Sequence, residues 1–238
     1  MTAGPRYAVY FVPHPDTALY RFGAEVLGCD CYAGGDVDHG PNLSMSRMEW
    51  SNLTREPRTY GFHATLKAPF QLAPDYVEAD LVKAFRAFAA KPRAALAITP
   101  SVELLDHFAA IVPRQASPDL DAFANTCVSA FDYFRAQMTS QERARRLRHN
   151  VSARQIANID RWGYPYVFED FRFHMTLTGP LPLDQRPPVL SFLRARFSAR
   201  YGETSLPIDH IALLRQDDPS ARFRVISHGQ LSIPLSKF

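Results

Sequence analysis

The sequence contains an internal repeat, and few folds can accommodate it. Residues 62–72 and 173–183 both follow the pattern F-H-x-T-L-x-x-P-x-x-L, with six identities in register. An apolar run that ends in a proline and a helical pattern precede each copy, while a second helical pattern and strand-like runs follow it. We therefore expect two related units, each with a strand, a helix, a histidine-bearing strand, a second helix and further strands.

These two units predict an α+β fold with two lobes related by a pseudo-twofold axis. The chain of 238 residues is 46% hydrophobic, which is enough to bury a substantial core. We expect a single bilobal domain over 1–238, with an N-terminal lobe at about 1–105, a C-terminal lobe at about 106–238, and strands that can exchange between them. A single parallel doubly wound sheet is the alternative, but no glycine-rich phosphate loop supports it.

Side-chain alternation along the two histidine-bearing strands predicts a shared polar surface. Successive side chains of a strand point to opposite faces, so His63, Thr65 and Lys67 share one face of the first strand. In the second strand, Arg172, His174 and Thr176 share a face in the same way. Each strand then packs an apolar face into its lobe and presents a histidine, a hydroxyl and a cation from the other face.

This set of side chains suits the cleavage of a phosphodiester. The reaction needs a base for the nucleophile and an acid for the leaving oxygen, and imidazole can play either part near neutral pH. Thr65 and Thr176 can donate hydrogen bonds to non-bridging oxygens, and Lys67 and Arg172 can supply countercharge. The scheme predicts no metal and no cofactor.

The paired H-x-T-L elements resemble those of the 2H phosphoesterase superfamily, which includes LigT-like RNA 2′,3′-cyclic phosphodiesterases. The resemblance implies that His63 and His174 are catalytic, that Thr65 and Thr176 bind the phosphate, and that two mainly antiparallel sheets face a central cleft with helices outside. More narrowly, residues 60–70, 162–166 and 171–179 resemble the DUF1045 branch, which is encoded beside carbon–phosphorus lyase genes for phosphonate use. This branch implies a role in phosphonate metabolism and makes a cyclic phosphate of ribose a natural substrate.

The predicted function is therefore a metal-independent phosphodiesterase that hydrolyses a small cyclic phosphodiester, with Tyr10, Tyr60 and Tyr164 as further candidates for substrate binding. Two alternatives stay open: a non-catalytic module that binds a phosphorylated metabolite, and an enzyme that processes RNA 2′,3′-cyclic phosphates. The formal net charge of +3 is too small to indicate a general nucleic-acid binder. The sequence leaves the substrate, the identity of the base and the oligomeric state undetermined.

Several features predict a cytoplasmic protein with no membrane partner. No apolar run approaches the roughly 20 residues that span a bilayer, and the first residues lack the pattern of a signal peptide. The three cysteines are odd in number, and we interpret them as buried or idle thiols: Cys29, Cys31 and Cys127.

Two segments lie outside the repeat. The first, 28–58, is rich in Gly, Asp, Ser, Asn and Pro, and we expect a long loop beside the site. In that segment His39 with Asp36 and Asp38 favours a turn over a metal site. The second, 139–170, begins with a T-x-x-E capping pattern, carries arginines that we expect on a solvated helix face, and ends in a Trp–Tyr stretch expected in the core. The arginines are Arg143, Arg145, Arg146 and Arg148, and the stretch is Trp162 to Tyr166.

Overall fold

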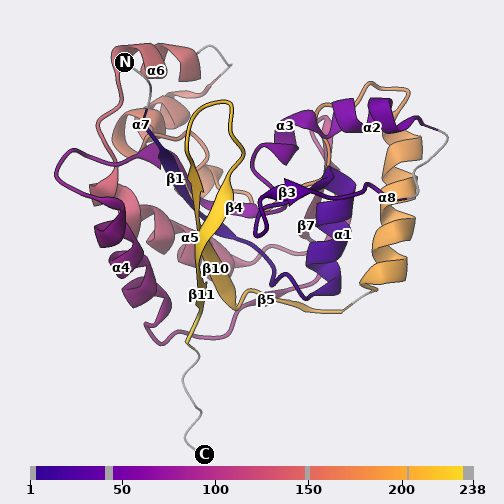
Figure 1. Ribbon diagram of the computed structural model, residues 1–238, viewed down its shortest axis with the longest axis horizontal. Helices are drawn as coiled ribbons and strands as arrows, with labels where there is room; N and C mark the ends of the chain where they lie inside the picture. Colours follow the sequence, from indigo (N-terminus) through magenta and orange to yellow (C-terminus); the bar gives the residue numbers. More distant parts are fainter. Residues whose placement is uncertain (1–3, 41–44, 148–150, 203, 233–238) are drawn as a thin grey trace, which may run out of the picture.

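The computed structural model describes residues 4–40, 45–147, 151–202 and 204–232, and it shows an α+β fold built on one seven-stranded sheet (Figure 1). Its strand order is β11-β10-β1-β4-β8-β7-β6, and each neighbouring pair is antiparallel, as the sequence predicts for the lobes. The strands are β1 (Arg6–Phe11), β4 (Ala64–Gln71), β6 (Pro100–Leu105), β7 (Phe108–Pro113), β8 (Met175–Thr176), β10 (His210–Gln216) and β11 (Arg224–Gln230). Two short ribbons pair β2 (Cys29–Asp30) with β3 (Gly35–Asp36) and β5 (Ala97–Ile98) with β9 (Leu206–Pro207).

The two expected sheets are the two halves of this one sheet, and they meet where the two motifs pair. Ala64 of β4 lies opposite Met175 of β8, and these residues occupy the same position in the two copies of the repeat. The outer neighbours repeat as well, because Phe11 of β1 pairs with Ala64 and Ile111 of β7 pairs with Met175. A local twofold axis therefore passes between the two motifs. β10 and β11, from the end of the chain, extend the half that contains β1 and β4.

One face of the sheet is apolar and is covered by helices. Phe11, Ala64, Ile111 and Met175 lie side by side on this face and are at most 1% exposed. The helices that cover it pack closely: a Cβ added at Gly23 would lie 2.1 Å from the ring of Phe62. Four helices belong to this layer: α1 (Ala18–Leu27), α4 (Glu78–Ala89), α5 (Pro118–Phe131) and α8 (Arg186–Arg200). In Figure 1, α4 and α5 flank one half of the sheet, and α1 and α8 flank the other.

The segment 28–58 is not the long loop that its composition suggests, so that prediction is wrong for the described part. It contains α2 (Arg47–Leu53) and α3 (Arg55–Arg58), while 41–44 lie outside the described residues. A capping box starts α2, because Glu49 accepts a hydrogen bond from the backbone N–H of Ser46 at 2.8 Å. Trp50 anchors the helix: it is fully buried, and its Nε1 donates to the carbonyl of Val26 at 2.8 Å.

The segment 139–170 forms α6 (Ser140–Arg146) and α7 (Ala153–Trp162) and ends in a short 3₁₀ turn at Phe168–Asp170, while another 3₁₀ turn precedes the segment at Asp132–Phe134. The expected capping box is confirmed, because the N–H of Glu142 donates to Thr139 Oγ1 at 3.2 Å. Arg143 and Arg145 are exposed, as expected, and Arg143 pairs with Asp160 at 2.6 Å, whereas Arg148 lies outside the described residues. Arg146 is half-buried with its Nε enclosed, so the prediction of a solvated face is wrong for this residue. None of the helices in the described part is long and apolar enough to cross a membrane.

Candidate active site

The two histidines of the repeat lie at the centre of the sheet, on the face opposite the helices. Continuing the register of Ala64 and Met175 by one residue in each direction places His63 opposite Thr176 and Thr65 opposite His174. Opposing residues of antiparallel strands point to the same side, with Cβ atoms about 4.5–5.5 Å apart. We call this side, which carries His63, Thr65, His174 and Thr176, the motif face.

Both imidazoles are held by the same backbone contact. Nδ1 of His63 lies 2.9 Å from the carbonyl oxygen of Gly61, and Nδ1 of His174 lies 2.8 Å from that of Arg172. A carbonyl oxygen can only accept, so in each neutral ring the proton is on Nδ1 and Nε2 carries the lone pair. Nε2 of His63 lies 3.2 Å from Thr65 Oγ1, where it can accept from the hydroxyl. The contact fixes each ring and presents a basic nitrogen.

Gly61 is required by the backbone at the first motif. Its φ of 76° lies in the left-handed region, and a Cβ there would approach the Cβ of Cys31 to 2.7 Å. The turn at Gly61 directs its carbonyl to His63. In the second motif Arg172 takes the equivalent position, and it has no such constraint on φ.

His63 lies in the more enclosed environment of the two histidines. The ring of Tyr10, which is 1% exposed, stacks on it with 3.9 Å between centroids and an interplanar angle of 27°. Burial lowers the pKa of His63 to about 4, although its bond to Gly61 raises it, and the nearby charge of His174 lowers it further. His63 is therefore neutral at physiological pH and available as a base.

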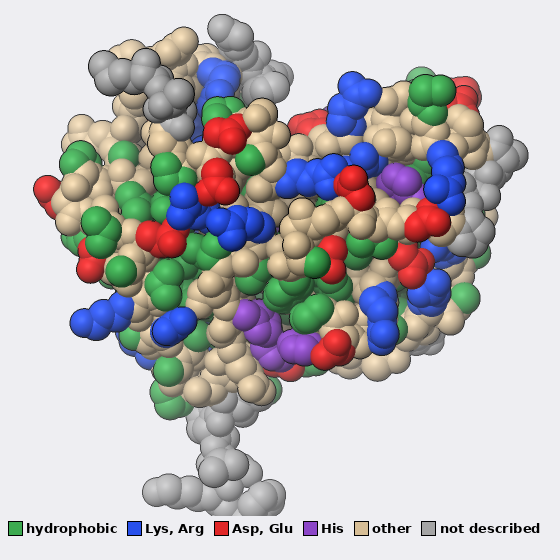
Figure 2. All heavy atoms as spheres, viewed as in Figure 1, with side chains coloured by type: hydrophobic (Ala, Val, Ile, Leu, Met, Phe, Trp, Pro, Cys, Tyr) green, Lys and Arg blue, Asp and Glu red, His purple; other side chains and the backbone are tan. Residues whose placement is uncertain are grey.

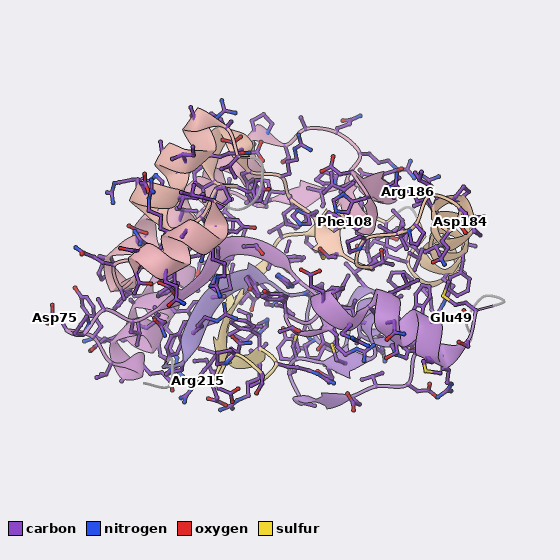
Figure 3. The ribbon with its side chains drawn as sticks, turned by 90° about the horizontal axis from the view of Figure 1, so that it is seen from above. Glu49, Asp75, Phe108, Asp184, Arg186 and Arg215 are labelled. Atoms are coloured by element: carbon purple, nitrogen blue, oxygen red, sulfur yellow. The ribbon has the colours of Figure 1, made fainter. Side chains whose placement is uncertain are left out.

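His174 has a different neighbour, Phe108, whose ring centroid lies 5.8 Å from its own. Figure 3 shows Phe108 near the middle of the molecule, away from Glu49 of α2 and Asp184 beside α8. Burial lowers the pKa of His174, and the positive charge of Arg172 lowers it further, while the bond to the Arg172 carbonyl raises it. Arg172 is exposed and lies close enough to His174 to interact with it electrostatically.

The three tyrosine candidates gather on the His63 side. Tyr60 lies 6.1 Å from His63 and stacks on Phe223, with 5.5 Å between ring centroids. Tyr164 interacts electrostatically with Tyr10 and Tyr60, and burial raises its pKa to about 12. Phe223, which is not among the candidates predicted from the sequence, is therefore part of the same group of rings. It lies on the connection between β10 and β11, about 160 residues after the first motif, and nothing in its local sequence marks it.

Lys67 does not share the motif face. Tyr10 pairs with Thr65 but Val9 pairs with Lys67, so β4 has one extra residue at this point and the side-chain alternation is interrupted. Lys67 consequently points to the helix-covered side, where it is 2% exposed and forms an ion pair with Asp132 at 2.6 Å. Burial lowers its pKa to about 8 against the opposing effect of Asp132. The interpretation of Lys67 as a countercharge for substrate is wrong because of this bulge.

Other candidates from the sequence lie away from the motif face. His39 contacts Arg58 at 3.3 Å, while Asp36 pairs with Arg222 and Asp38 with Arg47. Within the described ranges no group of three or more His, Cys, Asp or Glu side chains is arranged to hold a metal ion. The cysteines Cys29, Cys31 and Cys127 are buried, as expected. In the Trp162–Tyr166 stretch, Gly163 and Pro165 are buried, whereas Tyr166 is 48% exposed, so only part of it belongs to the core.

Solved structures with related names align over almost all of the chain at low similarity. One is described as "Crystal structure of phosphoesterase", with a TM-score of 0.42, 11% identity and coverage of 97% of this chain and 99% of the other. Another is "Crystal structure of E. coli LigT complexed with 3′-AMP", with a TM-score of 0.43, 15% identity and coverage of 96% and 99%.

Curated relatives carry the name "Ribose 1,5-bisphosphate phosphokinase PhnN". The protein from Janthinobacterium sp. (strain Marseille) is 36% identical over 221 residues, which are 92% of this chain and 49% of the relative. The protein from Laribacter hongkongensis (strain HLHK9) is 32% identical over 220 residues, 92% of this chain and 50% of the relative. The chain thus spans about half the length of the curated relatives it matches. Its residues 65–224 match the family described as "Protein of unknown function (DUF1045)", and the chain belongs to this family.

Proposed function

We propose that the chain is a phosphoesterase that hydrolyses a small cyclic phosphodiester, with His63 as the base and His174 as the acid. The observation that carries this proposal is the β4–β8 pairing, which sets each histidine opposite the threonine of the other motif. One tetrahedral anion between the strands can then contact two imidazoles and two hydroxyls. A pair of structural histidines has no need for this symmetric arrangement.

The reaction follows from the protonation states. Nε2 of neutral His63 removes a proton from a water molecule, whose oxygen forms a new bond to phosphorus. The bond from phosphorus to the leaving oxygen breaks, and protonated His174 donates its Nε2 proton to that oxygen. Thr65 and Thr176 donate hydrogen bonds to the non-bridging oxygens, where negative charge develops. The bound anion raises the pKa of His174, because a negative charge nearby favours the imidazolium form. None of these steps calls for a metal ion.

Two observations bear on the substrate class. The relatives are named for a ribose bisphosphate, which supports a phosphorylated ribose as the body of the substrate and a role in phosphonate metabolism, as the family resemblance implies. The kinase name does not transfer to this chain, which spans only half of those proteins and has no G-x-x-x-x-G-K-[ST] phosphate loop in its sequence.

A panel of cyclic phosphates, derived from ribose and from nucleosides, tests the proposal when assayed with EDTA present. We expect turnover of at least one ribose-derived member, and a loss of about 10²–10⁴ in kcat for His63→Ala and for His174→Ala. His107→Ala is the matched control, because that histidine is exposed in the turn before β7. Full activity in either motif variant would exclude the paired acid–base scheme. Saturable binding of the panel without any turnover would favour a non-catalytic phosphometabolite-binding module.

Processing of RNA ends is the other alternative, and the surface charge does not favour it. Basic and acidic side chains are interspersed on the face shown in Figure 2, in keeping with the net charge of +3. An RNA-binding surface would give an affinity for oligonucleotides that falls steeply with salt, in proportion to the phosphates contacted. We expect weak binding to oligonucleotides with little dependence on salt.

A further inference from the structure

Arg6 lies on the motif face, at the far end of the strand that carries Tyr10. Alternation along β1 puts Arg6, Ala8 and Tyr10 on one side, and Tyr10 pairs with Thr65. The Cα atoms of Arg6 and Tyr10 are about 13 Å apart at the rise of a strand, and only the methyl group of Ala8 lies between the two side chains. The guanidinium of Arg6 donates to Gln216 at 2.7 Å and lies 5.5 Å from the centroid of Phe223.

Arg146, the last residue of α6, lies close enough to Arg6 to interact with it electrostatically. Its Nε is buried and has no hydrogen-bond partner, and its guanidinium makes no ion pair with any residue in the described ranges. The closest acidic side chain on its helix, Glu142, is engaged in the capping box with Thr139. Buried donors are nearly always satisfied, and a buried cation is costly unless it has a partner. A group from outside the chain is the natural partner.

The two arginines belong to the surroundings of the site. Burial lowers the pKa of Arg146, while its interactions with Tyr164 and Glu142 raise it. The charge of Arg6 also acts on Arg146 and lowers its pKa. Tyr164 in turn interacts with Tyr10, the residue stacked on His63. In Figure 1, α6 and α7 lie beside the start of β1, in keeping with the electrostatic interaction between Arg146 and Arg6, which are distant in sequence. A row of rings thus connects the arginines to His63.

We propose that Arg6 and Arg146 bind a second phosphate of the substrate, a terminal phosphomonoester on the sugar that carries the cyclic phosphodiester. This inference rests on the proposed function for the reacting group. A dianion compensates two like charges that form no ion pair within the described residues, and phosphate oxygens match the planar fork of a guanidinium. The rings between the arginines and His63 provide the apolar surface on which a sugar lies. The substrate is then a sugar with phosphate groups at both ends.

Kinetics with paired substrates tests the assignment. We compare a ribose-derived cyclic phosphate with and without a terminal phosphate, using the wild-type chain, Arg146→Ala, and Arg145→Ala as the exposed control on the same helix. The terminal phosphate is expected to lower KM about 10–100-fold in the wild type and in Arg145→Ala, since hydrogen bonds to charged groups contribute strongly. In Arg146→Ala most of this difference disappears, while KM for the substrate without the terminal phosphate is unchanged. An equal rise in KM for both substrates overturns the assignment.

Binding measured without turnover separates this proposal from the proposed function. Calorimetry with ribose 5-phosphate is expected to show saturable binding to the wild type and to His63→Ala, and binding weakened at least about 10-fold in Arg146→Ala. Arg146→Lys keeps the charge but loses the fork, so it recovers only part of the affinity. If this pattern appears and no cyclic phosphate is turned over, the second-phosphate site is supported and the proposed hydrolase activity is excluded. Equal affinity in the wild type and Arg146→Ala removes the site, whatever the turnover assays show.

Discussion

The two copies of the motif are equivalent in sequence but differ in their surroundings. Around the first copy, β4 is eight residues long and His63 is stacked under Tyr10. Around the second copy, β8 has two residues, and the position equivalent to Tyr10 is Ala110, which pairs with Thr176. The backbone contact that fixes each ring is the same in both copies. The repeat therefore sets the position and tautomer of both imidazoles, while the neighbouring strands set how readily each takes up a proton.

In the proposed scheme this difference suits the two histidines to different parts in catalysis. Tyr10 and the surrounding rings exclude water from His63 and hold it neutral, which suits a base. His174 lies beside Phe108 and the exposed Arg172, on the side with the smaller Ala110. An incoming anion can reach it and raise its pKa, which suits an acid. Our proposed assignment of base and acid therefore depends on the asymmetry between the halves, since the two motifs alone are interchangeable.

The comparison extends to Lys67 and Thr178, which are equivalent in the repeat and are both structural. Lys67→Met breaks the buried ion pair with Asp132, and we expect it to lower the free energy of unfolding by about 3 kcal/mol. The loss is no larger because Asp132 keeps its ion pair with Arg135 at 2.8 Å. Thr178→Val removes the hydroxyl that accepts from the Ala109 N–H and costs about 1 kcal/mol. Denaturant unfolding measures both. A loss of kcat/KM in folded Lys67→Met would return Lys67 to the substrate site.

Lys67 also shows where prediction from the sequence stops. Alternation placed His63, Thr65, His174 and Thr176 on a common face, because the apolar residues between them set the parity of each strand. The bulge in β4 leaves no trace in that apolar pattern, so strict alternation predicts the wrong face for Lys67. The shortness of β8 is equally invisible in the sequence, since strand pairing depends on the approach of β7.

Helix starts can be predicted from a few neighbouring residues, whereas long-range contacts cannot. The capping box at Thr139 can be predicted from four residues, whereas the one that Ser46 and Glu49 form is found only in the structure. The approach of Arg146 to Arg6 joins residues far apart in the chain, so no local pattern predicts it. Local signals therefore place elements, and packing decides which side chains meet.

The cross-strand arrangement predicts that the threonines act as an equivalent pair. Thr65→Val and Thr176→Val are each expected to lower kcat about 10²-fold, because each removes a donor to the developing charge. The change from hydroxyl to methyl keeps the shape of a β-branched residue in both strands. Steady-state kinetics on the best substrate of the panel provides the measurement. A large effect from only one of the two threonines would mean that the anion lies on one side of the local axis.

The low pKa of His63 makes the stability of the fold depend on pH. The folded pKa of about 4 lies below the ordinary value of 6.5, so the unfolded chain binds more protons between these values. The contribution of neutral His63 to the free energy of unfolding is therefore fully present above pH 6.5 and is lost as the pH falls towards 4. We expect this loss to be about 2 kcal/mol once the partial exposure of the ring is allowed for. His63→Gln is expected to flatten this part of the curve in denaturant unfolding, and the exposed His107→Gln is its control. An unchanged slope in His63→Gln contradicts the neutral, enclosed state of His63.

The smallest expected effect tests the assignment of roles most directly. In the proposed scheme kcat/KM falls below the pKa of His63, near 4, and falls again above the pKa of His174, which lies below 6.5. Tyr10→Leu admits water to His63, so the acidic limb is expected to move upwards by about one pH unit, equivalent to about 1.4 kcal/mol. Phe108→Leu changes the surroundings of His174 and is expected to move only the alkaline limb. If both variants shift the same limb, the two halves do not divide base and acid between them, and the asymmetry of the sheet has no bearing on catalysis.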